Sequence, residues 1–93
     1  MKLIYSEPAI GDLLRLKTFI AENNVDAASR IAQELVERIE NLLMFPYIGK
    51  PVALAPNPHS IRDMVFGRYV VRYAVRQDVV VILRIWHHAE QRG

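Results

Sequence analysis

The spacing of apolar residues changes near the middle of the chain, and this change sets the fold class. Up to about residue 44, apolar residues recur every three or four positions, which is the period of an amphipathic helix. After Ser60 they form short runs rich in Val, Ile and Tyr, which is typical of β-strands. The 93 residues therefore predict one α+β domain over residues 1–93, with a helical part followed by a sheet.

Two helices are expected in the first half. The first covers residues 7–22, with Ser6 as its N-cap and Pro8 in its first turn. The second covers residues 26–44, with Asp26 as its N-cap. The acidic residues expected on the solvated faces of these helices are Glu7, Asp12, Glu34, Glu37 and Glu40.

The second half predicts an antiparallel meander of three strands, Ile61–Phe66, Tyr69–Arg76 and Val79–Trp86. An edge strand at Lys2–Tyr5 precedes the helices, and a weak strand at Val52–Leu54 lies in the proline-rich segment between the halves. The predicted fold is an N-terminal edge strand and a two-helix hairpin packed on one face of a three- to four-stranded antiparallel sheet.

The turn after Arg76 decides which residues share a face of the sheet. A two-residue turn would place Arg72 among the valines, so we expect an odd number of turn residues. The core face would then hold Tyr69, Val71, Tyr73 and Val75 with Val79, Val81, Leu83 and Ile85. The open face would hold Arg72, Ala74 and Arg76 with Ile82, Arg84 and Trp86.

Composition excludes several functions. The chain has no cysteine, which excludes a disulfide framework, a thiolate zinc site and a cysteine nucleophile. Its glycines are isolated, so no phosphate-binding loop is predicted, and no cofactor or metal is expected. No apolar segment is long enough for a membrane span or resembles a signal peptide, so a cytoplasmic protein that binds no membrane is expected. The acidic helical hairpin does not fit a helix-turn-helix, so direct DNA binding is not expected.

Charged side chains are divided unevenly between the halves. Residues 51–93 contain six arginines, no lysine and three acidic residues. Arginine presents a planar set of donors suited to carboxylates and phosphates, so this half predicts recognition of an anionic partner. Solvated strand positions are the other interpretation of each single arginine.

The segment from Trp86 to Arg92 is the densest group of functional side chains. His87 and His88 are adjacent and would point to opposite sides of an extended segment, which disfavours one shared metal ion. A histidine with Arg72 and Arg84 has the residue types that RNA cleavage needs. A polar terminus that binds another protein is the simpler interpretation.

The order of several short motifs resembles the ParE branch of the RelE/ParE toxin superfamily over nearly the whole chain. These motifs are Ala9-x-x-Asp12-Leu13, Phe19-Ile20, Ala27-Ala28, Ile39-x-x-Leu42, Phe45-Pro46-x-x-Gly49, Arg62, Tyr69-x-Val71-x-Tyr73 and Val81-Ile82-Leu83-Arg84-Ile85-Trp86-His87. The resemblance implies a toxin of a type II toxin–antitoxin pair that forms a hetero-oligomer with a cognate, ParD-like antitoxin. It implies contact with DNA only through that complex, and inhibition of DNA gyrase as the activity.

The resemblance also implies roles for particular residues. The target-binding residues would be Arg84, Trp86, His87, His88 and Arg92, and the antitoxin-binding residues Arg62, Arg72 and Arg76. The antitoxin would lay an amphipathic helix in an apolar groove and an extended strand on a sheet edge. RelE-type nucleases resemble one another in having Lys or Arg on the central strands. Here Val70 stands at one such position, which favours a toxin that is not an enzyme.

Two alternatives stay open at this point. A RelE-type toxin would cut mRNA on the ribosome, with Arg72, Arg84, His87 and His88 as its catalytic residues. A non-toxic remnant would only bind the antitoxin.

Overall fold

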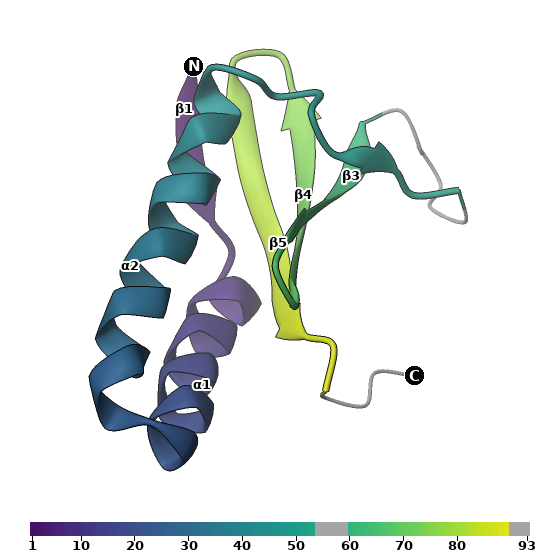
Figure 1. Cartoon of the computed structure of the whole chain (residues 1–93). Coiled ribbons are helices and arrows are strands. Elements are labelled where there is room, and N and C mark those ends of the chain that lie inside the picture. Colours follow the sequence, from purple (N-terminus) through teal and green to yellow (C-terminus); the bar gives the residue numbers. More distant parts are fainter. Residues whose placement is uncertain (54–59, 90–93) are drawn as a thin grey trace.

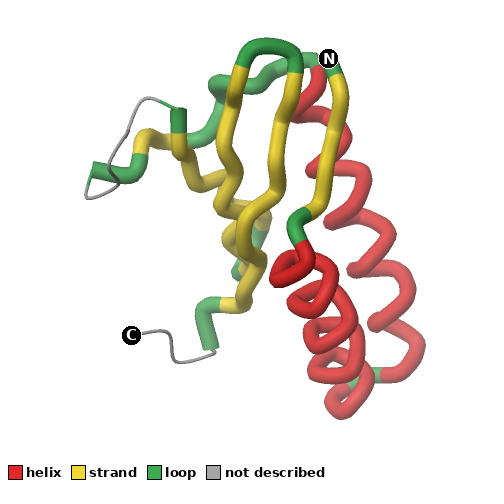
Figure 2. The backbone as a smooth tube through the Cα atoms, turned by 180° about the vertical axis from the view of Figure 1, so that it is seen from behind, coloured by secondary structure: helices red, strands yellow, loops and turns green. Residues whose placement is uncertain are grey.

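The structure is a computed structural model that describes residues 1–53 and 60–89. Two helices lie side by side and cover one face of a sheet (Figures 1 and 2). The elements in chain order are β1 (Lys2–Tyr5), α1 (Glu7–Asn23), α2 (Val25–Glu40), a short 3₁₀ helix (Asn41–Leu43), β2 (Lys50–Pro51), β3 (Ile61–Phe66), β4 (Tyr69–Arg76) and β5 (Val79–His87).

The sheet has five strands in the order β1-β5-β4-β3-β2. β1 runs parallel to β5, and the other neighbours are antiparallel. The predicted fold class, edge strand and helical hairpin are confirmed, but the sheet is mixed. A parallel pair needs a long crossover, which the two helices supply between β1 and the meander.

The strand expected at Val52–Leu54 is wrong in position. β2 is Lys50–Pro51, Val52 donates one further hydrogen bond to the Ile61 carbonyl (3.0 Å), and Ala53 begins a turn. Leu54 lies outside the described residues. Pro51 has no N–H to donate, which keeps this edge strand short.

The helix N-termini follow local chemistry. Ser6 caps α1 as predicted, since its Oγ accepts a hydrogen bond from the Ala9 N–H (3.1 Å). The cap of α2 is Asn24, which accepts from the Ala27 N–H (3.0 Å), so the prediction of Asp26 as the cap is wrong. Asp26 instead lies in the first turn, where its negative charge interacts favourably with the positive end of the helix dipole.

The second helix is also shorter than predicted, because its α-helical part ends at Glu40 and only the 3₁₀ turn continues it.

A bulge in β5 sets which residues share each face of the sheet. Arg76 pairs with Val79, so the turn has two residues and the prediction of an odd turn is wrong. Between Ile82, which pairs with Tyr73, and Arg84, which pairs with Arg72, one extra residue, Leu83, is inserted. A bulge shifts the alternation of side chains by one residue. Arg72, Arg84 and Trp86 therefore share the open face, as predicted.

The bulge also corrects the predicted core. Before the bulge, the β5 residues on the core face are Val80 and Ile82, both fully buried, in place of Val79, Val81 and Leu83. After the bulge it is Ile85, as predicted. The helices and β4 complete this core with Ala9, Leu16, Ile20, Ala28, Leu35, Ile39, Leu42, Tyr69, Val71, Tyr73 and Val75.

Candidate functional site on the open face of the sheet

Four charged side chains form a row across the open face, which we call the charged row: Asp63 of β3, Arg72 of β4, Arg84 of β5 and Asp12 of α1. Asp63 stands opposite Arg72 in the β3–β4 ladder, and Arg72 stands opposite Arg84 in the β4–β5 ladder. The register of the three strands therefore aligns Asp63, Arg72 and Arg84 before any side-chain contact is considered, and α1 adds Asp12 at the end of the row.

Arg72 is held on two sides. Its Nε and Nη2 donate to the two carboxylate oxygens of Asp63 at 2.8 and 2.9 Å. Its guanidinium carbon lies 5.2 Å from the centre of the Trp86 ring, within cation–π range. The hydrogen bonds to Asp63 raise the pKa of Arg72, so this guanidinium stays charged.

Arg84 makes the matching pair on the other side. Its Nε donates to Asp12 Oδ2 (2.8 Å) and its Nη2 to Asp12 Oδ1 (3.0 Å). Hydrogen bonding to Asp12 raises the pKa of Arg84. Both arginines are therefore engaged by carboxylates, and an anionic ligand would have to compete with those carboxylates for them.

Asp12 was expected on a solvated face, and this expectation is wrong, since only 2% of the residue is exposed. α1 takes over from β1 along the edge of β5, and Asp12 Oδ2 accepts the Ile85 N–H (2.8 Å) that would otherwise face a strand. Arg15 binds the same carboxylate and also donates to the Ile85 carbonyl (3.2 Å). Burial would raise the pKa of Asp12, but the bonds from Arg84, Ile85 and Arg15 outweigh it and lower the pKa to about 2.

Ser6 explains how α1 reaches that position. Its N–H donates to the Ile82 carbonyl and its Oγ to the carbonyl of the bulged Leu83, both at 3.0 Å. One residue thus caps α1 and joins it to the bulge. The sequence predicts Ser6 as the cap of the helix. Its hydrogen bond to the Leu83 carbonyl could not be predicted, because it depends on the tertiary structure.

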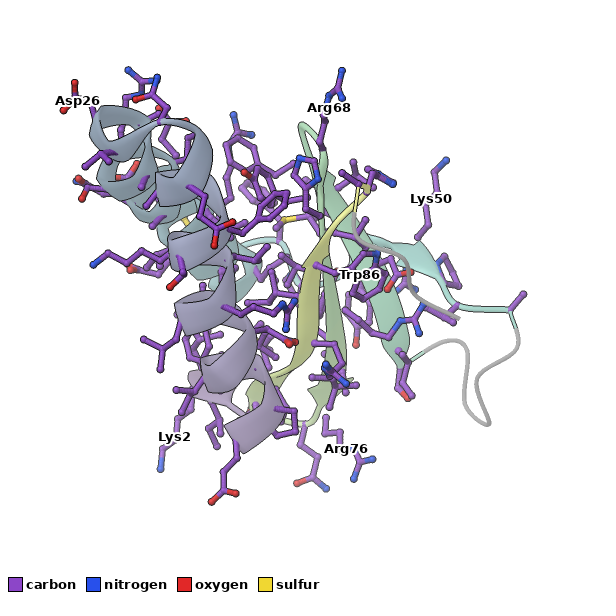
Figure 3. The ribbon with its side chains drawn as sticks, turned by 90° about the horizontal axis from the view of Figure 1, so that it is seen from below. Lys2, Asp26, Lys50, Arg68, Arg76 and Trp86 are labelled. Atoms are coloured by element: carbon purple, nitrogen blue, oxygen red, sulfur yellow. The ribbon has the colours of Figure 1, made fainter. Side chains whose placement is uncertain are left out.

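Apolar residues lie on both sides of the charged row. On one side, Ile4, Val81, Ala74 and Ile61 stand at paired positions on four strands. On the other side, Trp86 pairs with Val70, which pairs with Val65. Figure 3 shows Trp86 on the side of β5 that faces away from the helices. This open face has the composition of a protein-binding surface, with an aromatic residue and arginines near its centre.

His87 lies on the other face of β5. Its ring is 5.4 Å from the Phe19 ring of α1 and 4.9 Å from the Tyr69 ring of β4, measured between centroids. Its Nδ1 accepts a hydrogen bond from the Ala89 N–H (2.8 Å). The structure therefore does not bring His87 together with Arg72 and Arg84.

The other sequence-predicted residues are spread apart. His88 is exposed and its N–H donates to the Arg68 carbonyl (2.8 Å). Arg76 is exposed at the last position of β4, whereas Arg68 directly precedes the first. Figure 3 shows Arg68 and Arg76 at opposite ends of the molecule. Arg62 lies beneath the loop before β2, where it donates to the Gly49 carbonyl (2.9 Å). Arg92 lies outside the described residues.

Sequence reasoning missed the two carboxylates of the charged row. Asp12 was assigned to the solvated face of the first helix from its helical spacing, and Asp63 lies in a strand that carries no other signal. Among residues 1–53 and 60–89, no three His, Asp or Glu side chains are grouped as metal ligands would be. None of the described helices has the length and apolar character needed to cross a bilayer.

Comparisons with known proteins agree with this fold. A family model described as "ParE toxin of type II toxin-antitoxin system, parDE" matches residues 3–92. The chain is 33% identical over 92 residues to Toxin RelE1 of Caulobacter vibrioides, covering 97% of this chain and 96% of that protein. It is 30% identical over 89 residues to Toxin RelE2 of the same organism, covering 95% of this chain and 96% of that protein.

A solved structure described as "Chromosomal ParDE TA system from P. aeruginosa" superposes with a TM-score of 0.77. The match covers 94% of this chain and 95% of the solved one, at 20% sequence identity, so this likeness concerns the fold.

Proposed function

The chain belongs to the ParE toxin family of type II toxin–antitoxin systems, and from this premise we propose that it is a non-enzymatic toxin that inhibits DNA gyrase by binding it. The toxin acts in the cytoplasm and is neutralised by a cognate, ParD-like antitoxin in a hetero-oligomer. It contacts DNA only through that complex. The target surface comprises Arg84 and Trp86 on the open face and His88, which directly follows β5. Arg92, which the sequence also assigns to target binding, lies outside the described residues.

One observation supports binding over RNA cleavage. The proton-transfer group of a nuclease and its phosphate-binding arginines must meet at one point. Here His87 packs between Phe19 and Tyr69 on the helix side, whereas Arg72 and Arg84 lie on the open side and are already bound by carboxylates. A rigid aromatic side chain beside engaged arginines suits a protein interface instead.

The names of the two Caulobacter relatives favour the second candidate, a RelE-type mRNA endoribonuclease. Of His87 and His88, the two histidines in the described part of the chain, His88 is the exposed one, so that candidate would rely on His88. It would also need a ribosomal partner to displace Asp63 or Asp12 from the arginines.

The purified chain in a gyrase supercoiling assay, beside a ribosome-programmed mRNA cleavage assay, tests these candidates. Chain neutralised by its antitoxin serves as the control in both assays. We expect loss of supercoiling with intact mRNA. Cleaved mRNA with normal supercoiling would overturn the proposal and direct mutagenesis to His88, Arg72 and Arg84.

The proposed surface has its own test. Trp86→Ala removes the large aromatic contact and should raise the concentration needed for half-inhibition by about 10-fold or more. Val25→Ala is the matched control, because Val25 is 73% exposed at the start of α2 and outside the open face. Equal inhibition by both variants would place the target surface elsewhere.

A further inference from the structure

Asp63 lies between two cations on the open face of the sheet. It stands opposite Lys50 in the β2–β3 ladder and opposite Arg72 in the β3–β4 ladder. Directly opposed residues of antiparallel strands point to the same face, with their Cβ atoms about 5 Å apart. Arg84 stands opposite Arg72 on the far side. The strand register therefore sets Lys50, Arg72 and Arg84 in one line, and Asp63 interrupts that line after its first cation.

A line of cations beside an aromatic ring is suited to a single-stranded nucleic acid. Lysine and arginine side chains that neutralise successive phosphates supply the sequence-independent part of the affinity. An aromatic side chain adds stacking with a base. Trp86 lies on this face, with its ring centre 5.2 Å from the guanidinium carbon of Arg72. Without its carboxylates, the open face would have the composition of a surface that binds single-stranded RNA.

The carboxylate of Asp63 changes this composition. It accepts hydrogen bonds from Arg72 Nε and Nη2 at 2.8 and 2.9 Å, which is the two-point geometry in which arginine also binds a phosphate. The chain itself therefore occupies the donors that a phosphate would use. A phosphate at Arg72 would also lie beside the negative charge of Asp63, and like charges repel. Asp63 thus disfavours phosphate binding in two ways.

The pairing still leaves Arg72 able to bind an uncharged acceptor. Arginine has five N–H donors, and neither hydrogen bond to Asp63 uses Nη1. The Arg72 side chain is 37% exposed, so a partner can reach it. A backbone carbonyl of a partner protein can accept from Nη1 without displacing the carboxylate. Because the charges of the pair already cancel, such a contact needs no negative charge on the partner.

The contacts of Asp63 fit a role in specificity. In the described part of the chain, its carboxylate bonds to Arg72 and to no other side chain. Asp12 engages Arg84 in the same manner, but it also binds Arg15 and the Ile85 N–H. Removal of Asp12 would therefore disturb the packing of α1, whereas removal of Asp63 changes the open face alone.

We propose that Asp63 is a specificity-determining residue, which makes the open face reject single-stranded RNA and accept a protein surface that offers uncharged acceptors. The protein partner in this statement rests on the proposed function. The rejection of RNA rests on the geometry of Asp63, Lys50 and Arg72.

Fluorescence titration with a single-stranded RNA of about 10 uridines tests the proposal. Trp86 is the one tryptophan of the chain and lies beside Arg72, so its quenching reports binding at this site. We expect Asp63→Asn to bind the RNA at least about 10-fold more tightly than the wild-type chain, with a dissociation constant below about 100 μM. The logarithmic salt dependence should steepen by about 0.7 for each phosphate gained.

Two results would overturn the role of Asp63. One is saturable quenching of the wild-type chain with a dissociation constant below about 100 μM. The other is an affinity of Asp63→Asn within about 10-fold of the wild-type value. Asp63→Ser removes the same charge with a smaller side chain, and it takes the place of Asp63→Asn if circular dichroism shows that the asparagine variant is unfolded.

Three further variants separate Asp63 from general effects of charge and structure. Asp26→Asn is the matched control, because it removes one negative charge at an exposed position that Figure 3 shows away from Trp86. Asp63→Glu keeps the carboxylate, so both variants should reject RNA as the wild-type chain does. Arg72→Gln added to Asp63→Asn should abolish the gain. An equal gain in Asp26→Asn, or a gain that survives the loss of Arg72, would contradict the proposal.

The outcome is separate from that of the gyrase assay. A chain that rejects RNA through Asp63 but spares gyrase would keep the specificity against RNA and overturn the target. A chain that inhibits gyrase while its wild-type open face binds RNA would keep the target and overturn the role of Asp63.

Discussion

Asp12 is the residue on which the open face depends most. It is buried, joins α1 to the edge of β5, and binds Arg84, Arg15 and the Ile85 backbone at once. The position of Asp12 in the helical pattern does not predict this role, because Arg84 and Ile85 lie more than 70 residues away in the chain. Local spacing predicts helix faces well, but it cannot show which polar residue meets a strand edge.

The depressed pKa of Asp12 predicts a specific loss of stability in acid. The pKa is about 2 in the folded chain, against 3.8 for an aspartate free of such contacts, so the folded state favours the ionised form. Ionised Asp12 therefore adds to the free energy of unfolding above about pH 4. This stabilisation is lost as the pH falls toward 2, and the loss is about 2 kcal/mol. Urea unfolding between pH 6 and pH 2 measures it.

Asp12→Asn should unfold at lower urea at neutral pH, since it leaves Arg84 and Arg15 without their carboxylate, and should lack that part of the acid dependence. Glu34→Gln, at an exposed position on α2, should keep the wild-type profile. An unchanged acid profile in Asp12→Asn would contradict the assigned pKa.

Tyr73 gives a second prediction at the residue scale. Tyr73→Phe leaves the Gly49 N–H and the Pro46 carbonyl without their buried partner and should cost about 1 to 3 kcal/mol of unfolding free energy. Tyr47→Phe makes the same chemical change at a side chain that is 61% exposed and should change stability by less than about 0.5 kcal/mol. Chemical denaturation of both variants provides the comparison.

At the scale of elements, the open face of the β4–β5 hairpin was predicted correctly from the sequence, but the turn on which that prediction depended was wrong. The pattern required arginines on one face and valines on the other, and an odd turn was the simplest way to achieve this. The structure uses a two-residue turn and a bulge at Leu83 instead. The open-face residues Arg72, Arg84 and Trp86 were predicted correctly. Val79, Val81, Ile82 and Leu83 were assigned to the wrong face, because no local residue type indicates a bulge.

The turns of this meander predict a paired stability effect. Gln77, the first turn residue between β4 and β5, has φ +47°, and Gly67, at the same position between β3 and β4, has φ +58°. The backbone of residues other than glycine is strained at such positive φ angles. Gln77→Gly should therefore raise the unfolding free energy by about 0.5 to 1 kcal/mol.

Gly67→Ala should lower the unfolding free energy by about 1 kcal/mol, since open space surrounds Gly67 and only the backbone is strained. Thermal unfolding of the two variants checks the pair. A loss of stability in Gln77→Gly would mean that the glutamine side chain contributes more than its backbone strain costs.

For the whole molecule, the sequence was sufficient for the layout and insufficient for the site. Helical spacing, the Ser6 cap and the later strand pattern predict the hairpin and the meander, because those signals are local. The parallel pairing of β1, the charged row and the position of His87 each depend on residues far apart in the chain. The arginines were identified, but their carboxylate partners, which change what the arginines can do, were not.

Gyrase inhibition by the whole molecule is, in our proposal, a binding event, so its dose dependence is the most direct test. The chain is titrated against a fixed amount of gyrase in the supercoiling assay, with Trp86→Ala as the weakened variant. We predict inhibition that follows the molar ratio of chain to gyrase, levels off, and is reversed by added antitoxin. Full supercoiling at every ratio, with mRNA cleaved on ribosomes by far less than one chain per ribosome, would contradict the proposal.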